Sequence, residues 1–136
     1  MNALDEAHAL VAADDRKDFE FANRGFIATR VDPVIVRDGG GRAAFDLSSY
    51  GFLDGDAPET TNPSLWRQAQ ILTKHGLFKV ADHIYQVRGF DVSTVSFIDA
   101  GSGWIVVDPL TTVEVARAAL ELVGEHVAQK PVLAVI

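Results

Sequence analysis

The stretch GWIVVDPLTTVEVARAALELVGEHVAQKPVLAVI, residues 103–136, decides the fold of this chain. It begins with one apolar run and closes with another, VLAVI. A connection this long between two strands predicts a βαβ unit with parallel strands and a right-handed crossover. Because both strands are continuous apolar runs, we expect both faces of each to be covered. The helix between them is predicted to bury one apolar face: Val115, Ala119, Leu122 and Val123.

The start of this helix carries its own signal. Thr111 and Glu114 have the spacing of a capping box, in which each side chain accepts a hydrogen bond from the backbone N–H of the other residue. We expect the helix to run from there to about His126, with Glu114, Arg117 and Glu121 exposed.

Asp108 is the candidate site residue, because it ends the first strand of the unit and precedes a proline. In one interpretation, its carboxylate only caps the first turn at PLTT. In the other, it belongs to a site, because chemistry in α/β proteins gathers at the carboxyl ends of parallel strands. Residues after Ile136 would then emerge beside Asp108, which could serve as ligand, general base or orienting group. The chain supplies no other member of such a site.

The remaining segments predict a helix, a hairpin, a second helix and a run of antiparallel strands. Apolar positions from Leu4 to Ala22 indicate a helix that ends at Gly25. PVIVRDGGGRAAFDL, residues 33–47, has the pattern of a hairpin, and its glycines form a plain turn because no helix or Lys-Ser/Thr follows. The strands LFKV, HIYQVRG, STVSFIDA and GWIVVDP follow the second helix.

The second helix has a marked beginning. Asn62 is a natural N-cap, and Pro63 suits the first helical position. Its apolar stripe is Leu65, Ala69 and Leu72, with Trp66 beside it as a packing anchor at the edge of the sheet, and Gly76 is expected to close the helix.

Composition excludes several classes of function. The 136 residues suit one domain, and 48% of them are hydrophobic, as in a globular core. A net charge of −7 and a pI near 4.9 argue against binding to nucleic acid. No run approaches the roughly 20 apolar residues of a membrane span. The N-terminus lacks the features of a secretory signal, so we expect a cytoplasmic protein.

Nucleophiles and metal ligands are sparse. There is no cysteine, and the four histidines never pair at i, i+2 or i, i+4. A G-x-S-x-G turn is also missing. We therefore assign no catalytic, cofactor-binding or metal-binding residue to this chain.

Two longer stretches resemble a known family. NPSLWRQAQILTKHGLFKVADHIYQVRGFDVSTVSFID, followed by GWIVVDPLTTVEVARAALELV, is similar to the N-terminal part of the zinc-dependent alkylsulfatases of the metallo-β-lactamase superfamily. FEFANRGFIA, residues 19–28, extends the resemblance over nearly the whole chain. It implies an α/β fold, the incomplete N-terminal portion of an αβ/βα sandwich. Residues 1–58 would be a helix and hairpin extension, and residues 59–136 the start of the metallo-β-lactamase-like domain.

The resemblance also implies a site that this chain does not complete. In the family, the strand matching PVLAVI leads into a His-x-His-x-Asp-His loop that supplies the first zinc ligands. More ligands, a dimerisation region and a further domain follow. We therefore expect the chain to stop just before that loop, and to be inactive and without zinc by itself. The parent would be a homodimeric zinc enzyme acting on alkyl sulfates, with Asp108 supporting the metal-bearing loop by hydrogen bonds.

Two alternatives remain open. An unfinished sheet presents an edge to which another chain can pair, so the chain could be a non-catalytic interaction module. It could also belong to a hydrolase of the same fold that acts on another ester.

Overall fold

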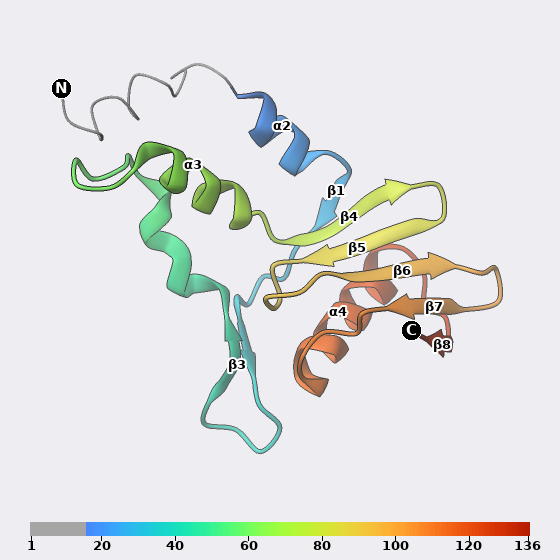
Figure 1. Ribbon diagram of the computed structural model, residues 1–136. Coiled ribbons are helices and arrows are strands. Elements are labelled where there is room, and N and C mark those ends of the chain that lie inside the picture. Colours follow the sequence, from blue (N-terminus) through green and yellow to red (C-terminus); the bar gives the residue numbers. More distant parts are fainter. Residues whose placement is uncertain (1–15) are drawn as a thin grey trace. The chain divides into compact units, whose positions relative to one another are not determined.

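The computed structural model describes residues 16–136, which form two compact units (Figure 1). The first unit joins the residues up to Asn23 with Ser49–Lys74. The second unit joins Arg24–Ser48 with His75–Ile136. The division into domains at residue 58 stays a prediction. Within the described part, no helix has the length and apolar character needed to cross a bilayer.

The first unit contains α2 (Lys17–Asn23), most of the 3-10 helix η1 (Leu47–Asp54) and α3 (Pro63–Leu72). The end of α2 confirms the predicted stop, because Gly25 adopts a left-handed φ of 73°. The predicted part of that helix before residue 16 lies outside the described residues. The predicted start of α3 is also confirmed, since the Asn62 side chain accepts hydrogen bonds from the next two N–H groups after Pro63.

The expected end of α3 at Gly76 is wrong. The helix ends at Leu72 with Thr73 as its C-cap, because the Thr73 N–H donates to Ala69 O and its hydroxyl donates to Gln70 O. Gly76 instead opens a strand. Within the apolar stripe, Leu65 and Leu72 are 69% and 70% exposed.

Trp66 and Gln70 make the contacts of α3 with η1 and with the loop after it. Trp66 Nε1 donates to Gly55 O at 3.0 Å, and the Trp66 ring meets Phe52 edge to face. Gln70 donates to the carbonyls of Leu53 and Gly55. Trp66 is therefore anchored to η1 and to the loop after it within its own unit, and its predicted place at the edge of the sheet stays a prediction.

The second unit is built on a mixed sheet with the order β1-β4-β5-β6-β7-β8. All neighbours are antiparallel except β7 and β8, which are parallel as predicted. The predicted hairpin forms a separate two-stranded sheet of β2 and β3. The strands are β1 (Phe26–Ala28), β2 (Val34–Val36), β3 (Ala43–Asp46), β4 (Gly76–Ala81), β5 (Ile84–Arg88), β6 (Val95–Asp99), β7 (Trp104–Val107) and β8 (Val132–Val135).

Helix α4 (Val113–His126) connects β7 to β8 and packs on the sheet, which confirms the βαβ unit (Figure 1). All four residues that were predicted to be buried are buried, namely Val115, Ala119, Leu122 and Val123, and Ala118 is buried as well. They join a core with the fully buried Trp104 of β7, whose indole meets Phe97 and Tyr85 edge to face. β8 is held beside β7 by their parallel pairing.

The predicted capping box is wrong by one residue. Thr112 is the N-cap of α4, and its hydroxyl accepts from Val115 N. Glu114 is drawn to the hairpin, where it accepts a hydrogen bond from Asp38 N at 3.1 Å, and is half-buried rather than exposed. Thr111 bonds to a more distant carboxylate, that of Asp91, described below.

Strand β8 also departs from expectation, because every one of its residues is exposed in the described structure. It forms an edge of the sheet there, so its apolar sequence is paired on one side only. Coverage of both faces holds better for β7, whose residues alternate between buried and half-buried.

Candidate functional site

The candidate site lies where β7 and β8 both end. Asp108 N donates to Ile136 O at 3.0 Å, and Ile136 N donates to Val106 O at 2.9 Å. The expectation that the end of β8 lies beside Asp108 is therefore confirmed. Parallel pairing alone produces this neighbourhood, because it brings the carboxyl ends of both strands to one edge.

Asp108 has an exposed side chain in an unusual backbone conformation. Its φ is 55°, in the left-handed region that few residues other than glycine, asparagine and aspartate adopt. Within residues 16–136, its carboxylate makes no hydrogen bond or ion pair. The capping interpretation fails on these contacts, because the first turn of α4 is capped by Thr112. The carboxylate is available to a partner from outside the described residues.

The loop that follows β7 is strained a second time at Leu110, whose φ is 71°. A left-handed conformation costs an L-residue with a bulky side chain about 1–2 kcal/mol. The surrounding structure must hold Leu110 there, and its partly buried side chain packs against the core. Strained residues of this kind gather at functional sites, where the surroundings fix an otherwise unfavourable geometry.

A residue that the sequence analysis did not select holds the far end of this loop. Asp91 lies between β5 and β6 and is only 8% exposed. Its carboxylate accepts hydrogen bonds from the hydroxyl of Thr111 and from Thr111 N, the latter at 2.7 Å. It also accepts from the N–H groups of Val92 and Ser93 in its own loop. One carboxylate therefore ties two loops together at the site.

The electrostatics of Asp91 follow from these contacts. Burial raises the pKa of its carboxyl, and the hydrogen bonds from Thr111, Val92 and Ser93 lower it; the net result is a pKa below the ordinary value. Asp91 is therefore ionised at neutral pH, which suits an acceptor surrounded by donors. A signal for it did exist in the sequence, since FDVST combines an aspartate and a serine in a connection between strands, a common pattern for local hydrogen bonds to backbone.

The histidines remain scattered in the structure. His75 Nδ1 lies 2.7 Å from the Thr29 hydroxyl, while His83 occupies the turn between β4 and β5. His126 ends α4, and His8 lies outside the described residues. Among residues 16–136, no three or more histidine, aspartate or glutamate side chains gather closely enough to hold a metal ion. The described side chains therefore do not fit a catalytic zinc, which needs about three protein ligands.

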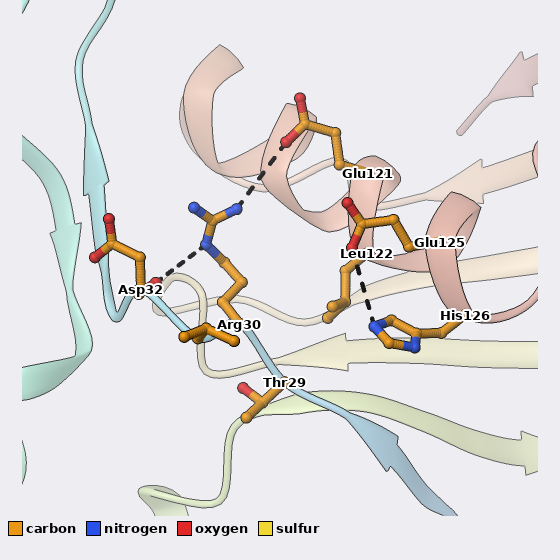
Figure 2. Close-up of a pocket in the computed structure, with 8 residues that line it drawn as sticks. Thr29, Arg30, Asp32, Glu121, Leu122, Glu125 and His126 are labelled. Carbon is orange, nitrogen blue, oxygen red and sulfur yellow. Dashed lines mark hydrogen bonds and ion pairs between the residues drawn. The ribbon is translucent and has the colours of Figure 1, made fainter.

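A separate hollow of about 250 Å³ lies between the segment after β1 and the end of α4, shown in Figure 2. Arg30 reaches Glu121 at 4.0 Å and donates to Asp32 O at 3.3 Å. His126 lies 4.0 Å from Glu125. The contact between Arg30 and Glu121 thus joins the two sides of the hollow. The hollow lies along the C-terminal half of α4, about 12–20 Å along the helix from the end that adjoins the candidate site, so it is a separate feature.

Comparison with known proteins confirms the resemblance to alkylsulfatases. No model of a protein family matches the chain. Alkyl/aryl-sulfatase BDS1 of Saccharomyces cerevisiae is 46% identical over 90% of this chain. A linear primary-alkylsulfatase and an (R)-specific secondary-alkylsulfatase, both of Pseudomonas sp., are each 45% identical over 90% of it. The solved structure of the stereoselective inverting sec-alkylsulfatase Pisa1 from Pseudomonas sp. superposes with a TM-score of 0.88 and 44% identity over 97% of this chain.

These relatives are much longer. The chain spans 18–19% of the three sulfatase sequences and 21% of the solved structure. The similarity is therefore established for a segment, and it includes the α/β arrangement with its mixed sheet.

Proposed function

We propose that this chain is part of an alkylsulfatase, a hydrolase that cleaves the sulfate esters of alkyl chains. The observation that carries the proposal is its sequence identity with three sulfatases that act on alkyl sulfates, over nine-tenths of its length. Because the chain spans about a fifth of those proteins, the activity is proposed for the whole protein. Alkyl sulfate is accordingly the proposed substrate.

The fold type, oligomeric state and metal of the whole protein are proposed from the family resemblance. We propose that the sheet and α4 form part of a metallo-β-lactamase-type sandwich, and that the whole protein is a homodimer that uses zinc. The described side chains do not fit a zinc ion. Its ligands would therefore come from parts of the whole protein other than residues 16–136, and no step of the reaction is assigned to it here.

Asp108 is proposed to support the metal-bearing loop. Its N–H binds Ile136 O, so a segment continuing from β8 would begin beside it. Its exposed carboxylate, which has no partner within residues 16–136, could accept hydrogen bonds from such a segment. Groups that orient metal ligands in this way typically change metal affinity or activity by about 10–100-fold when removed.

The proposal is tested with the protein expressed from the complete reading frame. Dodecyl sulfate is supplied, and released sulfate and dodecanol are both quantified, with dodecyl phosphate and dodecyl acetate as control esters. We expect equimolar sulfate and dodecanol, and little or no turnover of the controls. Hydrolysis of a control ester without hydrolysis of any alkyl sulfate would favour the hydrolase for another ester.

A second candidate function rests on the exposed edge strand. In β8 and the residue after it, Val132, Leu133, Val135 and Ile136 are 41–75% exposed. An apolar edge of this kind can pair with another chain, here proposed to be a second copy. Sedimentation of the 136-residue polypeptide should then show a dimer that Leu133→Lys converts to a monomer. A monomer with the original Leu133 would remove this candidate.

A further inference from the structure

Asp91 and Asp108 lie at the same end of the strands of the sheet, although 17 positions separate them in the sequence. Val87 of β5 pairs with Val95 of β6, so the connection that carries Asp91 turns at this end of both strands. The next residue of β6, Ser96, pairs with Val107, the last residue of β7. The connection between β5 and β6 therefore adjoins the loop that begins at Asp108.

Each oxygen of the Asp91 carboxylate accepts two hydrogen bonds. One oxygen receives the N–H groups of Val92 and Ser93, and the other receives both the N–H and the hydroxyl of Thr111. An asparagine at this position would offer only one acceptor oxygen, and its NH₂ group would face donors. The arrangement therefore requires an ionised aspartate rather than any polar residue of that size.

These bonds restrict the whole loop, because it is short and stiff. Asp108 is anchored at one end by its bond to Ile136 O, and Thr111 is anchored at the other end by Asp91. Between them, the ring of Pro109 fixes φ, and Leu110 is held in the left-handed region. Release of Thr111 would allow Leu110 to leave its strained conformation and would change the backbone next to Asp108.

A role in stability alone does not explain why a carboxylate is used at this position. Taking a charge out of water is unfavourable, and the hydrogen bonds from Thr111, Val92 and Ser93 outweigh that penalty, because the pKa of the Asp91 carboxyl lies below its ordinary value. An apolar contact between the two loops would stabilise the fold as well. The carboxylate adds direction, because two of its hydrogen bonds fix it in its own loop and the other two fix Thr111 against it.

We propose that Asp91 is a positioning residue, which holds the loop from Asp108 to Thr111 so that the Asp108 carboxylate keeps one place at the edge of the sheet. This inference rests on the proposed function for its effect on turnover, but its effect on the loop is independent of that function.

The experiment compares variants of the protein expressed from the complete reading frame. Asp91→Ala removes the acceptor, Thr111→Val removes the hydroxyl, and Thr111→Ser restores it. Asp99→Ala is the matched control. Asp99 lies in the same sheet but at the opposite end of the strands, where its carboxylate accepts hydrogen bonds from Gly101 N at 2.8 Å and from Lys130 Nζ at 2.6 Å.

Three quantities are measured for each variant: kcat and KM with dodecyl sulfate, the melting temperature, and hydrogen exchange of the amides in residues 104–112. In Asp91→Ala, we expect the Asp108 and Thr111 amides to exchange at least about tenfold faster and kcat to fall about 10–100-fold, with KM changed less than about threefold. Thr111→Val should show a smaller change in the same direction, and Thr111→Ser should resemble the original protein. Asp99→Ala should leave kcat and the exchange of the Asp108 and Thr111 amides unchanged, even where it lowers the melting temperature.

Two results would overturn the inference. One is unchanged exchange of the Asp108 amide in Asp91→Ala. The other is a loss of kcat no greater than in Asp99→Ala at a similar loss of melting temperature. If the original protein releases no sulfate, the proposed function fails instead, and the exchange measurement alone decides whether Asp91 holds the loop. Should Asp91→Ala not fold, the contrast between Thr111→Val and Thr111→Ser decides by the same two criteria.

Discussion

Gly103→Ala tests whether β8 is packed on β7 as closely as the site requires. A Cβ atom at position 103 would lie 2.5 Å from Pro131 O and 2.6 Å from Leu133 Cγ. Real Cβ atoms do not approach closer than 3.0 Å, so the chain around Pro131 must retreat by about half an ångström. That retreat strains the bond from Trp104 N to Pro131 O, now 2.8 Å long.

The magnitude follows from these two effects. Overpacking costs about 1–3 kcal/mol, and a weakened hydrogen bond about 0.5–1.5 kcal/mol. We expect opening of the β7–β8 pair to become easier by about 2–4 kcal/mol, and 2 kcal/mol corresponds to about 30-fold faster amide exchange. The assay is hydrogen exchange of the Trp104 and Ile136 amides, followed by mass spectrometry of the peptides that contain them.

Gly124→Ala is the matched control in the same βαβ unit. Its Cβ would meet nothing closer than the Gln129 side chain at 3.9 Å. Alanine is also a better helix former than glycine by about 1 kcal/mol. Exchange at Trp104 and Ile136 should therefore be unchanged or slower. Equal exchange rates in Gly103→Ala and the original chain would refute the packing, and with it the placement of the end of β8 beside Asp108.

Three further predictions concern Trp66 in the first unit, the loss of stability at low pH, and the 136-residue chain by itself. Trp66→Ala removes the contacts with Phe52 and Gly55. Because Trp66 is only half-buried, the loss of stability should be about 2 kcal/mol, less than the roughly 3–5 kcal/mol of a fully buried tryptophan. We expect a lower melting temperature with unchanged KM for alkyl sulfate, and a raised KM at normal stability would contradict this. The pKa of Asp91 is lowered despite its burial, so its stabilising effect is present above the ordinary carboxyl pKa of about 3.9 and is lost as pH falls through the lower pKa of the folded chain. Urea unfolding at pH 5 and pH 3 should thus show a smaller loss for Asp91→Ala than for the original chain, and equal losses would count against this. The 136-residue chain by itself should release no sulfate from dodecyl sulfate and retain no zinc after dialysis; stoichiometric zinc or turnover would mean that the site has been misplaced.

The parts of the fold that could be predicted are those specified by neighbouring residues. Asn62 followed by Pro63 marks the start of α3 without reference to anything distant. The run from Asp38 to Gly41 likewise specifies its own turn, and the apolar face of α4 specifies its burial. In each case, the periodicity or turn chemistry lies within a few positions of the element that it determines.

The errors arose where distant residues decide the outcome. Thr111 has the spacing of an N-cap, but Asp91 captures its hydroxyl and N–H across 20 positions, which leaves the cap to Thr112. Gly76 has the appearance of a helix stop, yet glycine is needed there because a Cβ would lie 2.4 Å from Ala28 O on the neighbouring strand. Local pattern does not reveal either approach.

The candidate site shows the same division. Topology alone placed Asp108 at the shared carboxyl edge of β7 and β8, and the bond to Ile136 O confirms that placement. Asp91 could not be connected to it from the sequence, because the contact exists only once the loop between β5 and β6 has folded against the loop between β7 and α4.

The most direct test of the account is Asp108→Asn in the protein expressed from the complete reading frame. Asparagine tolerates the left-handed φ of 55° at this position, so the change removes the charge and leaves the backbone in place. Bound zinc, the melting temperature and sulfate release from dodecyl sulfate are measured together. The account predicts an unchanged melting temperature with zinc affinity or kcat lowered about 10–100-fold. Zinc content and turnover equal to those of the original protein would contradict it.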